Sequence, residues 1–120
     1  MAKDMKISFL LDFYGDVLTE KQREVVEYYY NDDLSLSEIA ENEGITRQGV
    51  RDAIKRAEAQ LLELESRLGF ARRFRETQRG LEEIRAAAER IRGENARAAC
   101  VRGIDEEAKK ILAVARRLGE

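Results

Sequence analysis

The stretch Leu36–Arg56, LSEIAENEGITRQGVRDAIKR, constrains the fold more than any other part of the chain. Just before it, Ser35 begins the S-x-x-E pattern of a capping box that Glu38 completes, and such a box starts a helix. Gly44 supplies the positive φ that a tight turn between helices needs. Thr46 is a good N-cap for a second helix. The stretch therefore predicts a helix-turn-helix.

The second helix of this motif carries different residues on its two sides. Val50 and Ile54 lie four positions apart and are expected to face the first helix. The other side is polar: its arginines could hold phosphates as bidentate forks, and Gln48 could read the edge of a base. Charged stripes are more often solvated helix faces, which is the other interpretation. We predict nucleic-acid contact by Thr46, Arg47, Gln48, Arg51, Lys55 and Arg56.

The composition of the 120 residues is that of an all-α protein. Proline is absent, charged residues make up 38% and aromatic residues 7%, and Ala, Leu, Glu and Arg are abundant. No apolar run approaches the ~20 residues that a membrane-spanning helix needs, and residues 1–9 lack the features of a signal peptide. We expect a helical protein without membrane insertion, located in the cytoplasm.

The sequence offers no catalytic constellation. Cys100 is the only cysteine and histidine is absent, so the chain has no Cys/His zinc site and no imidazole to act as a general base. No pair of carboxylates stands out, and no P-loop is present. We therefore expect no catalytic, cofactor-binding or metal-binding residues and no enzyme activity.

Charge is distributed unevenly along the chain. Residues 1–70 carry 9 Lys/Arg against 15 Asp/Glu, whereas residues 71–120 carry 13 against 9. An autonomous DNA-binding domain is expected to be basic, because phosphate neutralisation supplies much of its affinity. The polar stripe is thus a small basic island in an acidic half, and that half suits a protein partner as well.

Two amphipathic helices are predicted before the motif. The first spans Lys6–Leu18. A capping box of Thr19 and Gln22 opens the second, which ends at Asn31–Asp33. The apolar side of the first helix is expected to consist of Phe9, Leu10, Phe13 and Val17.

The second helix of the motif is long for a helix that enters a groove. From Thr46 it is expected to continue to Leu68, with its C-terminal half packed against the next helix, and Gly69 stops it. Glu43 occupies a position that is usually apolar in this motif, so a shallower contact is expected there. Residues 1–69 are predicted to form one helix-turn-helix domain.

Residues 70–120 are predicted to form a C-terminal helical extension that serves as a packing, dimer or partner surface. After Gly93 a weak stretch is expected to pass Cys100 and Gly103, followed by a last helix capped by Asp105. Two antiparallel helices or a coiled-coil dimer seam would both fit, and the small number of clean heptads favours the first. The apolar positions that suggest heptads are Phe74, Leu81, Ile84, Ala88 and Ile91.

Two resemblances meet in the first half of the chain. The helix-turn-helix resembles that of sigma factor region four, which reads promoter DNA with the helix that begins at the position of Thr46. The wider segment of residues 6–70, with its DFYG signature at Asp12–Gly15 and its LTEKQ signature at Leu18–Gln22, closely resembles the YlxM family. The match beyond Phe70 is weak.

The YlxM resemblance implies a small all-α bacterial protein, with a sigma region four-like helix-turn-helix bundle followed by C-terminal helices. It also implies an accessory role in the signal recognition particle pathway, with contact to the particle's GTPase, Ffh, or to its RNA. A non-enzymatic DNA- or RNA-binding regulatory protein of this pathway is our first hypothesis. The alternative is a sequence-specific DNA-binding transcription regulator, paired as a homodimer through its C-terminal helices.

Overall fold

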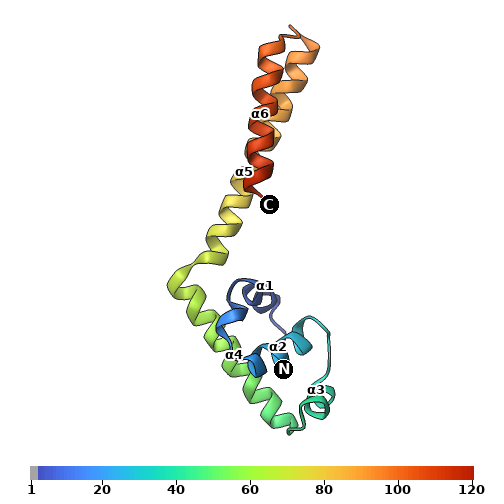
Figure 1. Cartoon of the computed structure of the whole chain (residues 1–120), viewed down its shortest axis with the longest axis vertical. Coiled ribbons are helices and arrows are strands. Elements are labelled where there is room, and N and C mark those ends of the chain that lie inside the picture. The colour runs from blue at the N-terminus through green and yellow to red at the C-terminus, as the bar shows by residue number, and fades with distance from the viewer. Residues whose placement is uncertain (1–2) are drawn as a thin grey trace. The chain divides into compact units, whose positions relative to one another are not determined.

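A computed structural model describes residues 3–120, and this part of the chain contains six α-helices, one 3₁₀ turn and no strand (Figure 1). The all-α fold class is confirmed. The chain forms two compact units, Met1–Ala71 and Arg72–Glu120. None of the described helices is both long enough and apolar enough to cross a membrane. The elements are α1 (Met5–Tyr14), η1 (Gly15–Val17), α2 (Glu20–Tyr30), α3 (Leu36–Glu43), α4 (Arg47–Leu68), α5 (Phe70–Arg97) and α6 (Arg102–Leu118).

Helix α1 is shorter than the predicted helix Lys6–Leu18, and its apolar side differs from the predicted one. It ends at Tyr14, where the chain tightens into η1. This change of winding turns Val17 outward, so that its side chain is 56% exposed, and Leu18 is buried in its place. The predicted core position Leu10 is buried, whereas Phe9 and Phe13 are only half-buried. The buried side of α1 consists of Ile7, Leu10, Leu11 and Tyr14.

Both predicted capping boxes are confirmed. The Thr19 hydroxyl accepts a hydrogen bond from the Gln22 backbone N–H at 3.2 Å, and the Gln22 side chain accepts one from the Thr19 N–H at 3.1 Å. Ser35 and Glu38 make the same reciprocal pair, both at 3.1 Å. These bonds satisfy backbone donors that the first turn of a helix leaves without partners, and they set where α2 and α3 begin.

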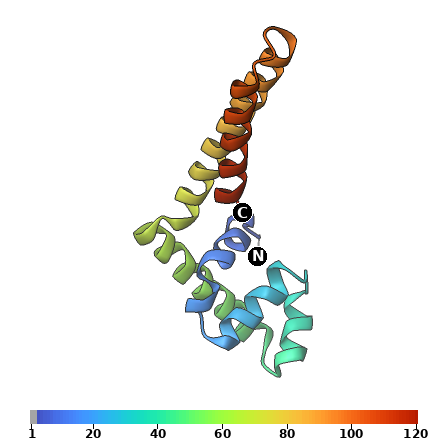
Figure 2. The ribbon, with the colours of Figure 1, turned by 45° about the horizontal axis from the view of Figure 1, so that its top comes forward.

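Helix α4 is the element on which the other helices of the first unit pack. Four of its side chains are completely buried, and it packs against α1, α2 and α3 (Figure 2). Its predicted extent to Leu68 is confirmed. The hydrogen bond from Tyr14 to Glu65 shows that the C-terminal half of α4 contacts α1, and the packing of that half on the next helix stays a prediction. The buried side chains are Val50, Ile54, Ala57 and Leu61.

A cluster of hydrogen bonds fixes the end of α4. Gly69 has a φ of 65° and stops the helix, as predicted. The Tyr14 hydroxyl donates to Glu65 Oε1 at 2.6 Å and accepts from the Phe70 N–H at 3.1 Å. The same Glu65 oxygen accepts from the Ala71 N–H at 3.0 Å. Burial and the bond to Glu65 raise the pKa of Tyr14. This cluster supplies partners for backbone donors at the start of α5.

The second unit is an antiparallel hairpin of α5 and α6 (Figures 1 and 2). The predicted weak stretch is shorter than expected, because α5 continues to Arg97 and only residues 98–101, around Cys100, lie between the two helices. The predicted cap by Asp105 is wrong, since α6 begins after Val101. Asn95, which is 9% exposed, holds the turn: its amide donates to the Val101 C=O at 2.8 Å, and its oxygen accepts from the Val101 N–H at 2.9 Å.

Replacing Tyr14 by Phe should lower the free energy of unfolding by about 1–3 kcal/mol, because the part-buried Phe70 N–H and Glu65 carboxylate would lose a partner. Tyr28→Phe is the matched control. Its hydroxyl donates to Glu24 at 3.3 Å in a half-buried position, so the change should stay within about 0.5 kcal/mol. Urea denaturation followed by circular dichroism measures both. Equal losses for the two variants would contradict the role assigned to the cluster.

Replacement of glycine by alanine should have opposite effects on stability at two positions. Gly44 has a φ of +66° and no atom within 4 Å of an added Cβ, so Gly44→Ala should cost about 1 kcal/mol through backbone strain alone. Gly80 also has free space but lies within α5, so Gly80→Ala should stabilise the hairpin by about 0.5–1 kcal/mol. Thermal unfolding of the two variants tests the difference in sign.

Candidate nucleic-acid interface

The turn of the helix-turn-helix is built as its sequence predicts. Helix α3 ends at Gly44 in the left-handed region, with φ 66° and ψ 32°. The next residue, Ile45, returns its N–H to the Ala40 C=O at 3.1 Å. Thr46 then caps α4, because its hydroxyl accepts from the Gly49 N–H at 3.0 Å. Thr46 was predicted to contact nucleic acid, and its hydroxyl serves to position the start of α4.

Glu43 does not make the shallow contact that was expected of it. Its side chain is only 5% exposed, and it accepts a hydrogen bond from the Lys21 ammonium at 2.6 Å. This bond raises the pKa of Lys21. The pair ties the end of α3 to α2 next to the turn. Sequence reasoning missed Lys21, although a charge at a usually apolar position was a signal that Glu43 needs a partner.

The structure places all of the predicted contact residues of α4 on exposed positions. The sides that carry them face away from the core, because Val50 and Ile54 are completely buried. Arg47, Arg51 and Lys55 follow one another at intervals of four residues, which corresponds to ~6 Å along a helix. The exposed side chains are Arg47, Gln48, Arg51, Lys55 and Arg56.

The cations of this stripe are free of ion pairs. Within the described chain, no carboxylate lies within 4.0 Å of any of the four. Other cations of the same unit are neutralised, such as Arg23 by Glu27 and Arg67 by Glu63. The first turn of α4 contains no acidic residue, so the positive end of the helix dipole adds to the local potential. The four cations are Arg47, Arg51, Lys55 and Arg56.

Gln48 is less free than its predicted role requires. Its amide Nε2 donates to Asp52 Oδ1 at 3.0 Å, one turn further along α4. To read an adenine with both amide atoms, Gln48 would have to give up this bond. Asp52 is the acidic residue among the basic ones, and the sequence prediction did not consider it.

In residues 3–120 no cluster of three or more His, Cys, Asp or Glu could hold a metal ion.

Comparison with known proteins places the chain in a family. Residues 1–98 match the model of the family UPF0122, described as "Putative helix-turn-helix protein, YlxM / p13 like". The UPF0122 protein STH1464 of Symbiobacterium thermophilum is 45% identical over 90 residues, which cover 75% of this chain and 84% of the relative. The UPF0122 protein Teth514_1714 of Thermoanaerobacter sp. is 43% identical over 105 residues, which cover 88% and 90%. The chain therefore belongs to the UPF0122 family of YlxM/p13-like helix-turn-helix proteins.

Proposed function

We propose that this protein is a non-enzymatic factor that binds nucleic acid through the exposed cations of α4 and acts in the signal recognition particle pathway. In this proposal it contacts Ffh, the particle's RNA, or both. One observation carries the nucleic-acid part: four unpaired cations lie within ten residues of α4, on the exposed sides of an otherwise acidic unit. The pathway part rests on what the YlxM resemblance implies.

The unpaired state of the cations matters for binding energy. A cation that already pairs with a carboxylate must give up that partner before it can hold a phosphate. Arg51 and Lys55 have no such partner among the described residues, so they can displace counterions from a phosphate backbone directly. Their spacing of ~6 Å lets them contact separate phosphates of one strand.

The acidic residues in the rest of the first unit limit its contact with nucleic acid to the exposed side of α4. Residues 1–70 carry 15 acidic against 9 basic side chains, which would repel a duplex that wrapped around the unit. Contact by α4 alone predicts weak binding that depends strongly on salt. A protein partner would have to supply the remaining affinity, which favours a ribonucleoprotein over free DNA as the target.

The second candidate is a transcription regulator that places α4 in a DNA major groove. Its support is the exposure of Gln48 next to the turn, where a recognition helix makes its base contacts. The two candidates differ in selectivity. Preference for one DNA fragment over bulk competitor would favour the regulator, whereas binding that follows only phosphate charge would not.

Replacing Arg51 and Lys55 together by Ala should weaken RNA and DNA binding. Two fewer phosphate contacts should reduce the slope of log K against log salt by about 1.4 for a single strand and 1.8 for duplex DNA. Fluorescence anisotropy with a labelled oligonucleotide across a salt titration measures both the affinity and the slope.

The matched control is Lys6→Ala with Arg67→Ala, which removes the same charge from exposed positions of the same unit. This control should leave the slope unchanged. If the two double variants lose affinity equally, the binding follows net charge, and the stripe on α4 has no special role.

The pathway is tested by purification of the tagged protein from lysate of its own bacterium, followed by identification of both protein and RNA in the eluate. We expect Ffh and the particle's RNA to be enriched over an untagged control. Nuclease treatment before elution separates direct contact with Ffh from contact through RNA. Their absence, together with enrichment of DNA fragments, would support the regulator instead.

A further inference from the structure

The hairpin of α5 and α6 carries an apolar groove along one side. Three adjoining hollows make up this groove. The first two share Ile91 and Ile104, and the second and third share Glu107 and Ile111. The groove therefore runs without a break from the turn at Ala98 down to the end of α6.

The two sides of the hairpin differ in chemistry. Away from the groove, Arg92 pairs with Asp105 at 2.9 Å, and Lys109 pairs with the same carboxylate at 3.2 Å. The charges of these three residues on the polar side are therefore paired within the hairpin. The groove side consists mainly of aliphatic side chains, and the charged residues that line it are Arg90, Glu94, Glu107 and Lys110.

The exposed aliphatic residues recur every seven positions on both helices. Ile84 and Ile91 of α5 are 48% and 46% exposed, and Ile104, Ile111 and Leu118 of α6 are 43%, 43% and 61% exposed. A seven-residue repeat presents the side chains of each helix to a neighbouring helix, as in coiled coils and four-helix bundles. Since both helices show the repeat, the face is built to accept two further helices.

We propose that a second copy of this chain covers the groove, so that two hairpins form a four-helix bundle with a two-fold axis along the hairpin. The grooved part of α5, residues 81–98, is ~26 Å long, and two packed helices are ~20 Å wide. A face of these dimensions has an area of about 520 Å², which is about two thirds of the ~800 Å² per partner that a standard stable interface buries. This inference does not depend on the proposed function.

Two charged residues that line the groove define the orientation of the two copies. The contacts of Arg92 with Asp105 and of Gln78 with Gly119 set the register of the hairpin, and this register places Arg90 of α5 level with Glu107 of α6. Both residues line the groove. With the two-fold axis along the hairpin, α5 of one copy lies on α6 of the other, so Arg90 meets Glu107 of the second copy twice.

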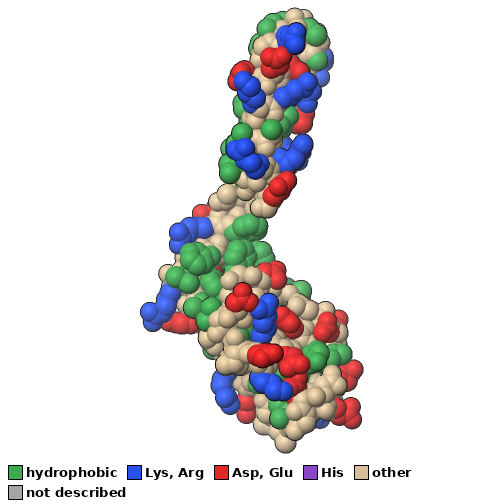
Figure 3. Space-filling model, viewed as in Figure 1, with side chains coloured by type: hydrophobic (Ala, Val, Ile, Leu, Met, Phe, Trp, Pro, Cys, Tyr) green, Lys and Arg blue, Asp and Glu red, His purple; other side chains and the backbone are tan. Residues whose placement is uncertain are grey.

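The opposite orientation is disfavoured by the same charges. If the axis ran across the hairpin, α5 would lie on α5 and α6 on α6, and near the centre of the groove Arg90 would face Arg90 and Glu107 would face Glu107. The pairing region as a whole is neutral. Residues 81–112 carry seven Lys/Arg and seven Asp/Glu, and Figure 3 shows the two signs interspersed along the hairpin.

The first test is the mass in solution. Sedimentation should give twice 13.8 kDa for the full chain at micromolar concentration. Ile111→Asp puts a charge into the groove of both copies and should weaken association by at least ~100-fold. Ala113→Asp on the same helix is the control, because Ala113 is exposed and does not line the groove. A monomer at every concentration would overturn the proposal and leave the face for a helix of another protein.

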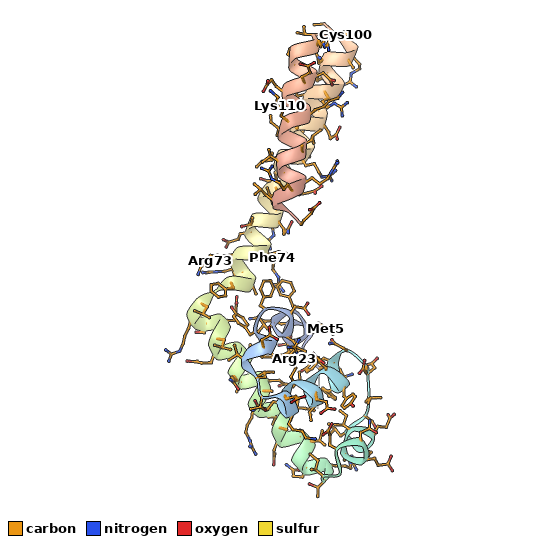
Figure 4. All side chains as sticks on the ribbon, viewed as in Figure 1. Met5, Arg23, Arg73, Phe74, Cys100 and Lys110 are labelled. Atoms are coloured by element: carbon orange, nitrogen blue, oxygen red, sulfur yellow. The ribbon has the colours of Figure 1, made fainter. Side chains whose placement is uncertain are left out.

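The second test uses the single cysteine as a reporter of orientation. Cys100 is exposed at the tip of the hairpin (Figure 4). A thiol cross-linker that spans ~10 Å, the spacing of packed helices, should join two copies efficiently. Cys100→Ser should abolish the product, and Ile111→Asp should reduce it to the level of random collision. A dimer by mass that does not cross-link would overturn the orientation, since its tips would lie ~30 Å apart.

The third test exchanges the charges of Arg90 and Glu107. Glu107→Arg or Arg90→Glu alone should weaken association by at least ~3-fold, because each change replaces two attractive pairs by repulsive ones. The double exchange should restore it. Additive losses in the double variant would overturn the pairing of Arg90 with Glu107. Helix content by circular dichroism confirms that each variant remains folded.

Discussion

The structure of the first unit depends on the packing of one side of α4 against three other helices. Val50, Ile54, Ala57 and Leu61 are completely buried along that side, and burial of each larger side chain contributes about 1.5–3 kcal/mol. A rotation of α4 about its axis would expose them. The rotation is therefore fixed, and with it the direction of the cations on the other sides. The exposure of the basic stripe is a consequence of the core.

The sequence predicted those helix starts that depend on hydrogen bonds between residues close together in the chain. Thr19 with Gln22, Ser35 with Glu38, and Thr46 with Gly49 each close a hydrogen bond over three positions. The sequence signal and the physical cause are then the same short segment. The boundaries that it missed depend on the tertiary structure: Asp105 does not cap α6, because Asn95 holds the Val101 backbone and Arg92 pairs with Asp105.

In the candidate site too, some features follow from the local sequence and others depend on residues far apart in the chain. Periodicity alone predicted that Arg47, Arg51 and Lys55 would share exposed sides of α4, since Val50 and Ile54 had to face the core. Periodicity could not show how Glu43 is accommodated. Its partner Lys21 lies on a separate helix, 22 positions earlier in the chain. Only the fold brings the two together, and the pair makes a charged residue tolerable at a position that is usually apolar.

On the hairpin, the side chains between α5 and α6 are mostly small, whereas the exposed face carries larger aliphatic side chains. Where α5 meets α6, the buried positions are mostly small, namely Ala88, Ala108 and Ala115, with Leu112 as a larger one. The large aliphatic residues Ile91 and Ile111 stand beside this line and remain about half exposed. A hairpin stable by itself would place its largest apolar side chains at the internal contact, where they bury most area. The reverse arrangement is the one expected of half a bundle, in which the outer row of each hairpin becomes the core when the second hairpin packs on it.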